Sequence, residues 1–154
     1  MSVAAISRAR QMIRELTLPG QRRVHFAKES DARRKQVLDV VDLVAPDVVI
    51  YDSSLCARRR QREACLEHVV RDLAKSGASL LVIGSDESVV ALDRRLLFRY
   101  VRQLDCDTLE YRHLRAREEP LLAVPDALAW CWHRGGHWRK RVASLVSDVQ
   151  QITE

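Results

Sequence analysis

The apolar residues of this chain follow two kinds of pattern, and each pattern predicts one kind of element. Residues 48–51 and 80–83 are short, continuous apolar runs, which are typical of strands covered on both faces of a sheet. Elsewhere, apolar residues recur every three or four positions, as they do along one face of an amphipathic helix. This spacing predicts helices over residues 3–16, 30–44, 58–76, 86–104, 121–133 and 137–152. Two further strands are predicted at residues 22–26 and 108–114.

The alternation of strands and helices predicts an α/β fold. Residues 48–83 have the length of a strand–helix–strand unit, so its two strands are expected to lie parallel and to be joined by a right-handed crossover. Ser30 is expected to cap the second helix, and Gly77 to end the third. Because the chain has no internal repeat, linker or low-complexity segment, residues 1–154 are predicted to form a single domain.

Composition places the chain among globular proteins. It has 154 residues, of which 47% are hydrophobic and 31% are charged, and a domain of this length can bury a substantial core. No apolar run approaches the ~20 residues of a bilayer span, and the N-terminal segment lacks the apolar region of a secretory signal. We therefore expect a cytoplasmic protein with no membrane association. The four cysteines have neither disulfide nor zinc spacing and are expected to be reduced.

The formal net charge of +5 favours a polyanionic partner, with nucleic acid as the first candidate. Of the 26 basic residues, 22 are Arg and four are Lys, a bias that a GC-rich genome would also produce. Three basic clusters are interpreted either as a track for a phosphate backbone or as solvated helix faces: residues 33–35, 58–60 and 139–141. Three tryptophans are candidates for stacking on bases or for the core: Trp130, Trp132 and Trp138.

Several function classes are set aside because their motifs do not occur. The sequence contains neither GxxxxGK[ST] nor GxSxG, the patterns of P-loop NTPases and of serine hydrolases. Cys131, His133 and His137 have the residue types of a zinc site. However, Gly135 and Gly136 interrupt the helix between the two histidines, and no fourth ligand is near in sequence. A zinc site is not expected.

Acidic residues follow the two apolar strands. Asp52 ends the first, and Asp86 and Glu87 come shortly after the second. Ligands of α/β sheets bind beyond the carboxyl ends of the strands, so these acids stand where a Mg²⁺ or Mn²⁺ site for phosphodiester cleavage would lie. The alternative is structural: Asp86 and Glu87 complement the dipole of the next helix, and Asp52 forms a turn.

Asp126 is the second kind of candidate, because it begins a helix that is apolar before and after it. A partly buried carboxylate there would need a cation or a metal as partner, although an acid beside Pro125 also suits a helix N-terminus. His25 and Glu29 flank the end of the predicted first strand. They are either accessory groups of a metal or substrate site or hydrogen-bonded structural residues.

Three segments carry a resemblance to a known family: RRVHFAKESDARR at residues 22–34, LLVIGSDESVVALDRR at 80–95 and PLLAVPDALAW at 120–130. They resemble a ribonuclease-H-like family of unknown function from bacteria, whose members open with an Asp-Glu-Ser strand. The resemblance covers residues 19–141. It implies a three-layer α/β fold with helices on both faces of the sheet, and a nuclease that uses Mg²⁺ or Mn²⁺. By the same resemblance, Asp126, Asp86 and Glu87 would be catalytic, Asp126 and Asp86 would bind metal, and His25 and Glu29 would be accessory.

The chain departs from the family pattern at two places. No Asp-Glu-Ser strand precedes the first helix, and Gly84 stands where the family has an acid at the end of a strand. We therefore expect a degenerate or truncated nuclease, or a start codon that is misassigned with the strand encoded upstream. A sheet without its first strand has an exposed edge, which favours a homo-oligomer. The alternative is a non-catalytic module that binds nucleic acid or protein.

Overall fold

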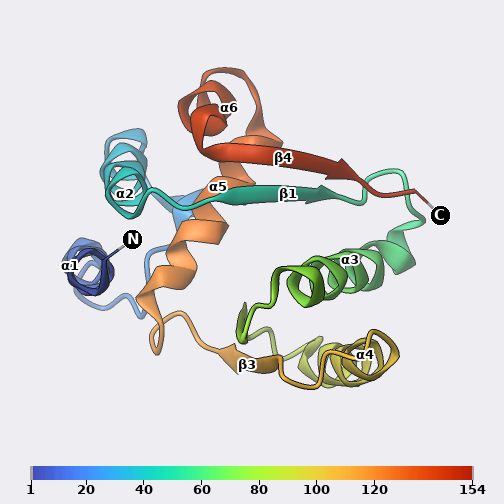
Figure 1. The fold of residues 1–154 in the computed structure, drawn as a ribbon. Helices are drawn as coiled ribbons and strands as arrows, with labels where there is room; N and C mark the ends of the chain where they lie inside the picture. The colour runs from blue at the N-terminus through green and yellow to red at the C-terminus, as the bar shows by residue number, and fades with distance from the viewer. Residues whose placement is uncertain (1, 154) are drawn as a thin grey trace. The chain divides into compact units, whose positions relative to one another are not determined.

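The computed structural model describes residues 2–153, and its helices and strands confirm the α/β class (Figure 1). The chain divides into two compact units. Unit 1 comprises residues 2–48 and 115–147, and unit 2 comprises residues 49–114 and 148–153. No helix within the described residues is both long and apolar enough to cross a membrane.

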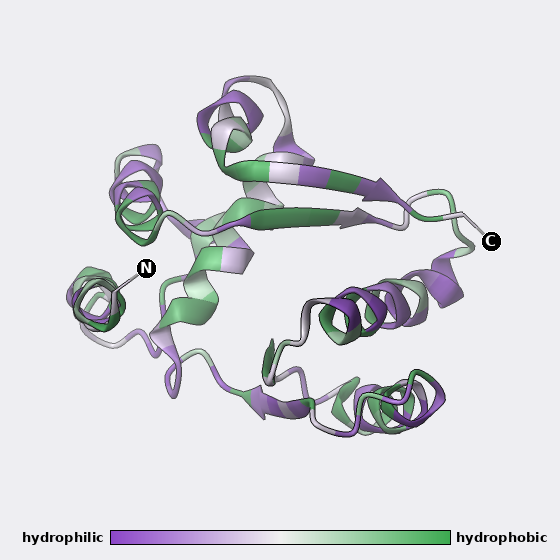
Figure 2. Ribbon diagram, viewed as in Figure 1, coloured by the Kyte–Doolittle hydropathy of each residue, from purple (hydrophilic) through white to green (hydrophobic). Residues whose placement is uncertain are grey.

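Unit 1 is a group of helices. Its elements are α1 (Val3–Leu16), η1 (Phe26–Lys28), α2 (Asp31–Val44), η3 (Pro120–Leu122), α5 (Ala123–Arg134), α6 (Gly136–Val142) and η4 (Ala143–Leu145). Helix α2 carries hydrophobic residues on one side and hydrophilic residues on the other (Figure 2). Helix α1 packs on α2, and α5 packs on α2, α6 and η1. The Ser30 side chain accepts a hydrogen bond from the Arg33 N–H at 3.3 Å, which confirms Ser30 as the cap of α2.

Unit 2 contains most of the strands. Its elements are β1 (Val48–Asp52), η2 (Arg58–Arg60), α3 (Gln61–Ser76), β2 (Leu80–Gly84), α4 (Val90–Gln103), β3 (Glu110–Leu114) and β4 (Val146–Gln151), with the first residue of β1 and the first two of β4 assigned to unit 1. Strands β2 and β3 pair in parallel, from Leu80 opposite Glu110 to Gly84 opposite Leu114. Gly77 ends α3 with φ of 70°, as expected of a left-handed C-terminal cap.

The core of unit 2 lies between its two long helices. Helix α3 packs on α4, and the buried residues of this cluster are Leu66, Val70, Leu96, Leu97, Tyr100, Val101, Cys106 and Leu109. Leu81 and Ile83 of β2 and Tyr111 of β3 pack against it but stay partly exposed. The apolar runs therefore form strands as expected, but they are not covered completely on both faces.

Strand pairing differs from the prediction. We expected residues 48–51 and 80–83 to be parallel strands of one strand–helix–strand unit, but β1 pairs with β4 and β2 pairs with β3, in separate sheets. The parallel strand–helix–strand unit is therefore β2–α4–β3 rather than β1–α3–β2. The described strands form two two-stranded sheets, and the ribonuclease-H-like arrangement of a single sheet stays a prediction.

Two predicted elements are wrong. Residues 22–26 form no strand: the chain turns into η1 at Phe26, and the side chains of Val24 and Phe26 are buried. The last helix, expected over residues 137–152, ends at Val142. Residues Val146–Gln151 form β4, which pairs with β1. The Ile152 N–H extends this pairing by one hydrogen bond to the Asp52 carbonyl, at 2.8 Å. A strand is favoured there because β1 would otherwise lack a hydrogen-bonding partner.

Candidate functional site

A pocket lies in unit 1, where the end of α1 and the segment 22–24 meet the chain that leads into α5. Its apolar wall includes the buried residues Ile13, Val24, Pro120 and Ala123. Its charged lining consists of four arginines and one acid: Arg14, Arg22, Arg23, Arg117 and Asp126. The pocket thus combines an apolar wall with an excess of positive charge.

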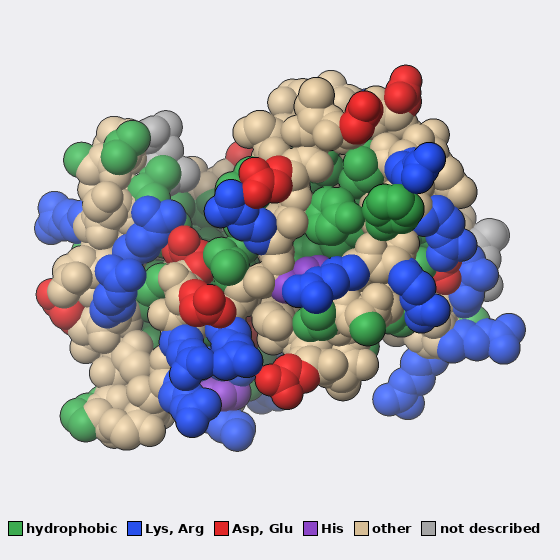
Figure 3. Space-filling view, turned by 90° about the horizontal axis from the view of Figure 1, so that it is seen from below, with side chains coloured by type: hydrophobic (Ala, Val, Ile, Leu, Met, Phe, Trp, Pro, Cys, Tyr) green, Lys and Arg blue, Asp and Glu red, His purple; other side chains and the backbone are tan. Residues whose placement is uncertain are grey.

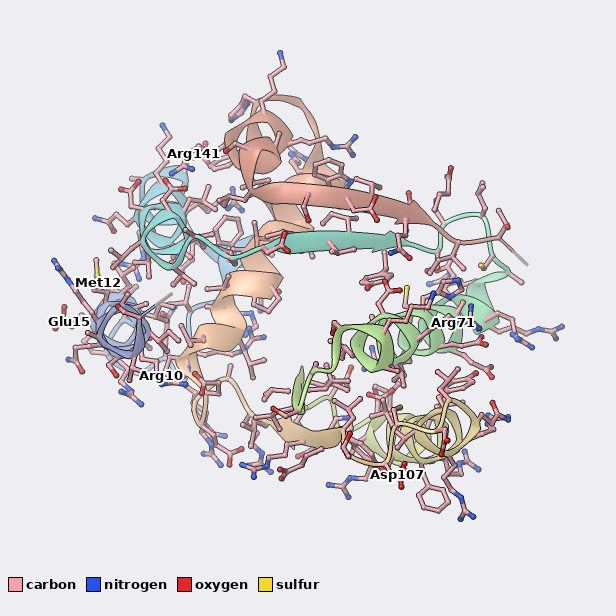
Figure 4. All side chains as sticks on the ribbon, viewed as in Figure 1. Arg10, Met12, Glu15, Arg71, Asp107 and Arg141 are labelled. Carbon is pink, nitrogen blue, oxygen red and sulfur yellow. The ribbon has the colours of Figure 1, made fainter. Side chains whose placement is uncertain are left out.

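The walls of the pocket are held together by an ion pair between distant parts of the sequence. Arg10 of α1 donates to both carboxylate oxygens of Glu119, at 3.0 and 3.1 Å, and Figure 4 shows Arg10 beside the loop that precedes α5. Burial by itself would raise the pKa of Glu119, but hydrogen bonds from Arg10 and from the Leu121 N–H, with the charge of Arg10, lower it below its usual range. The pair fixes α1 against η3.

The pocket arginines form no ion pair among the described residues, which distinguishes them from other arginines of unit 1, although the charge of Arg14 helps to lower the pKa of Glu119. Within residues 2–153, no ion pair joins Arg14, Arg22, Arg23 or Arg117 to a carboxylate. Four other arginines of the unit each hold acids: Arg10 with Glu119, Arg33 with Glu29, Arg34 with Asp31, and Arg141 with Asp39 and Asp42. The four guanidinium groups of the pocket therefore lack an ion-pair partner among the described residues.

Asp126 lies in the first turn of α5 and lines the pocket. Of the two interpretations of Asp126, the partly buried carboxylate is wrong, because Asp126 is exposed. The helical period sends Ala123, Val124 and Ala127 into the core and turns Asp126 outward. The carboxylate is therefore solvated and needs no metal to offset burial.

His25 lies close enough to Asp126 for the charge of the carboxylate to affect it. Partial burial lowers the pKa of His25, and the positive charges of Arg23 and Lys28 lower it further, while Asp126 and Glu29 act in the opposite direction. The net shift is downward, so His25 is neutral at pH 7. His25 and Asp126 therefore interact electrostatically, and the accessory role of His25 stays a prediction.

Glu29 has a structural role. It is buried, and its Oε2 accepts a hydrogen bond from Arg33 Nε at 2.7 Å. The same guanidinium donates to the Leu16 carbonyl at the end of α1. Among the described residues, Oε1 of Glu29 has no hydrogen-bond partner. The Glu29–Arg33 pair therefore joins the start of α2 to the end of α1.

Asp86 and Glu87 belong to unit 2, so the two predicted metal ligands, Asp126 and Asp86, fall in different units. Asp86 forms a turn before α4: its Oδ1 accepts hydrogen bonds from the Ser88 hydroxyl at 2.7 Å and the Ser88 N–H at 3.0 Å. These two bonds lower the pKa of Asp86. Asp52 likewise accepts a hydrogen bond from the Ser54 N–H at 2.9 Å. The structural interpretation accounts for both aspartates.

The aromatic residues of the last helices belong mainly to the core. Trp130 and Trp138 pack edge-to-face at 5.5 Å, and each also meets Phe26. The Arg34 guanidinium lies 4.2 Å from the centre of Trp130 and donates to the carbonyls of Phe26 and Ala27, at 3.0 and 2.7 Å. This cluster explains why residues 22–28 fold onto α5 rather than forming a strand.

Unit 2 contains a buried ionic cluster that was not predicted from the sequence. Asp93 of α4 is 0% exposed and receives two hydrogen bonds from Arg62 of α3, at 2.7 and 2.6 Å. His113 Nε2 of β3 lies 3.2 Å from the same carboxylate. Burial by itself would raise the pKa of Asp93, but Arg62 and His113 lower it. The signal was present in the sequence, since Asp93 falls on the apolar face of its predicted helix.

The donor residues do not gather into a metal centre. Within the part of the chain that the structure describes, no three His, Cys, Asp or Glu side chains are placed to hold a metal ion together. Comparison of the chain with models of known protein families, with curated proteins and with solved structures gave no match.

Proposed function

We propose that the protein binds nucleic acid and that the pocket of unit 1 holds one of its phosphate groups. The observation that carries this proposal is the charge of the pocket, which is lined by four arginines and one acid. A guanidinium group suits phosphate because it donates two parallel hydrogen bonds to phosphate oxygens and keeps its charge at physiological pH. Since these arginines hold no described carboxylate, an incoming phosphate would not have to displace one.

The apolar wall of the pocket favours a phosphate group that belongs to a larger molecule over a free phosphate ion. Ile13, Val24 and Pro120 offer no donor to a free ion, but they could contact the carbon atoms of a sugar while the arginines at the rim bind the charge. Nucleic acid is the polyanion that presents sugar and phosphate together. Phosphate contacts of this kind give affinity without reading the base sequence.

The resemblance to the ribonuclease-H-like family extends this proposal. We infer a degenerate ribonuclease-H-like protein, derived from a metal-dependent nuclease, that keeps the phosphate contacts. A two-metal site of that kind needs several carboxylates around the phosphate, and the donor set of the described residues does not fit one. Binding without a metal-dependent step is therefore the function that we propose.

One observation favours phosphodiester hydrolysis as a second candidate. Asp126 lines the same pocket, so its carboxylate would adjoin the bound phosphate. A carboxylate oxygen is the ligand type that Mg²⁺ and Mn²⁺ prefer. His25, held neutral beside it, could accept a proton from water.

Binding is tested by fluorescence anisotropy with a labelled single-stranded oligonucleotide at several salt concentrations. The test variant is Arg22→Gln/Arg23→Gln, and the control is Arg8→Gln/Arg134→Gln, which removes the same charge from exposed positions outside the pocket lining. Each lost phosphate contact should reduce the salt slope of log Kd by about 0.7. We expect this reduction in the pocket variant alone. Equal losses in both variants, or no binding at low salt, would contradict the proposal.

Hydrolysis is tested by calorimetric titration of Mn²⁺ into the wild type and Asp126→Asn, together with a cleavage assay. A nuclease would be supported if the wild type binds Mn²⁺ and cleaves the oligonucleotide, and if Asp126→Asn does neither. If the wild type neither binds Mn²⁺ nor cleaves, but still binds the oligonucleotide, binding is the function and hydrolysis is rejected.

A further inference from the structure

The outer face of α4 carries an exposed aromatic ring among arginines. Phe98 is 56% exposed, although large aromatic side chains usually bury most of their surface. Arg94, Arg95 and Arg102 stand four and three residues before it and four after it, so all three are its neighbours on the helix surface. The Arg102 guanidinium lies 5.3 Å from the centre of the Phe98 ring. In the view of Figure 3, hydrophobic side chains are seen among Lys and Arg side chains on the surface.

These arginines are not neutralised by the fold. Among the described residues, Arg94, Arg95 and Arg102 form no ion pair with a carboxylate. Arg99, on the same helix, lies 3.6 Å from Glu63. The acid next to Arg94 in sequence, Asp93, is buried against Arg62. The face is therefore positively charged, with a ring at its centre.

We propose that this face of α4 binds single-stranded nucleic acid, with an unpaired base stacked on Phe98 and the flanking phosphates at Arg94, Arg95 and Arg102. Stacking on an exposed aromatic residue combined with basic contacts to the backbone is the general mode of single-strand binding. The surface lies in unit 2 and shares no residue with the pocket of unit 1. The proposal for α4 therefore does not depend on the function proposed for that pocket.

Two other occupants fit the face less well. A helix that lies on an anionic membrane inserts its apolar side, but the apolar side of α4 is already buried, through Leu96, Leu97, Tyr100 and Val101. A duplex could meet the arginines, but its bases are paired and stacked on one another, so they would leave Phe98 without a partner. The exposed ring is the feature that favours an unpaired strand.

The experiment compares the affinity of the full chain for a labelled oligo-dT and for a duplex of equal length. Phe98→Leu keeps an apolar side chain and removes the aromatic face; because Phe98 is exposed, the core is left intact. Loss of one stacked base should weaken oligo-dT binding by about fivefold to a hundredfold. Duplex binding should not change.

The arginines are tested by Arg94→Gln/Arg95→Gln, with Arg58→Gln/Arg59→Gln as the control, which removes two exposed arginines from η2 of the same unit. We expect the salt slope for oligo-dT to fall by about 1.4 in the first variant, at 0.7 per contact, and to stay unchanged in the second. Both double variants are also measured in a protein that carries Arg22→Gln/Arg23→Gln. Any change in oligo-dT affinity that remains in this background comes from α4 and not from the pocket of unit 1.

The proposal would be overturned by unchanged oligo-dT affinity in Phe98→Leu, by equal affinity for the duplex, or by equal effects of the two arginine pairs. Binding of phosphatidylserine vesicles or of poly-glutamate that depends on Phe98 while oligo-dT does not bind would also overturn it. The first probe stands for a membrane surface and the second for an acidic protein.

Discussion

Replacing Arg62 with Met should destabilise unit 2 by about 2–3 kcal/mol. Arg62 donates two hydrogen bonds to the Asp93 carboxylate, which is 0% exposed. Removing one partner of a buried ion pair leaves an uncompensated charge and costs about 3–5 kcal/mol. We place the cost below that range for two reasons: the Arg62 side chain is 42% exposed, so solvent screens part of the pair, and His113 remains 3.2 Å from the carboxylate.

A second pair on α3 provides a matched control. Arg71 is also 42% exposed, and it holds Glu67 at 3.0 Å, but Glu67 is 35% exposed, whereas Asp93 is 0% exposed. Arg71 is labelled on α3 in Figure 4. Because both partners are solvated, Arg71→Met should cost at most about 1 kcal/mol. The two variants therefore differ mainly in the burial of the acid.

Urea unfolding followed by circular dichroism measures the free energy of unfolding of both variants, and hydrogen exchange of α3 and α4 amides assigns the loss to unit 2.

The pH dependence of stability supplies a second check. In the wild type the pKa of Asp93 is lowered, so its contribution to stability is present above the unfolded value of about 3.9 and is lost as the pH falls through the folded value. Without Arg62, burial dominates and raises this pKa. As the pH falls from 7 to 5, the buried Asp93 of the variant should take up a proton and lose its unpaired charge. The difference in the free energy of unfolding between the wild type and the variant should therefore become smaller.

Equal costs for Arg62→Met and Arg71→Met would refute the argument that burial of Asp93 decides the strength of the pair. A gap that stays constant or widens between pH 7 and pH 5 would refute the assignment of the cost to an unpaired carboxylate.

Three further predictions concern unit 1. Ser30→Ala should cost about 1 kcal/mol in urea unfolding because the Arg33 N–H loses its cap, whereas Ser30→Asp should retain most of the stability. Burial raises the pKa of the Cys131 thiol to about 11, so mass spectrometry should find it unmodified by iodoacetamide at pH 8 in the folded protein and alkylated in urea. Arg34→Lys should cost about 1–2 kcal/mol, since the planar group that faces Trp130 and donates to two carbonyls is lost; an unchanged urea midpoint would contradict this role.

Local features of the sequence were sufficient to locate most helices. The helix beginning after Ser30 and the helix ending at Gly77 were predicted with their caps, and both are observed. Caps and the 3.6-residue period depend on neighbours within four positions, so the sequence contains the required information directly. The start of α4 was predicted four residues too early, because Asp86 forms a turn with Ser88 before the helix begins.

The site was predicted only in part. Asp126 was selected from the sequence and lines the pocket, but the idea that it is partly buried was wrong, because its helical position turns it away from the apolar residues on both sides. The pocket arginines were not selected at all. Arg14, Arg22 and Arg117 belong to no common motif, and no pattern in the sequence indicates that they line one pocket with Asp126.

The sequence by itself determined the α/β class, most of the helices, the caps at Ser30 and Gly77, and the segments that form β1, β2 and β3. Only the tertiary structure decided that β1 pairs with β4, that four arginines surround a pocket, and that Asp93 meets Arg62 and His113. The physical reason is the range of the interactions. Helices and caps are stabilised by contacts within a few residues, whereas strand pairing and buried ion pairs join residues that are distant in sequence and become neighbours only when the core forms.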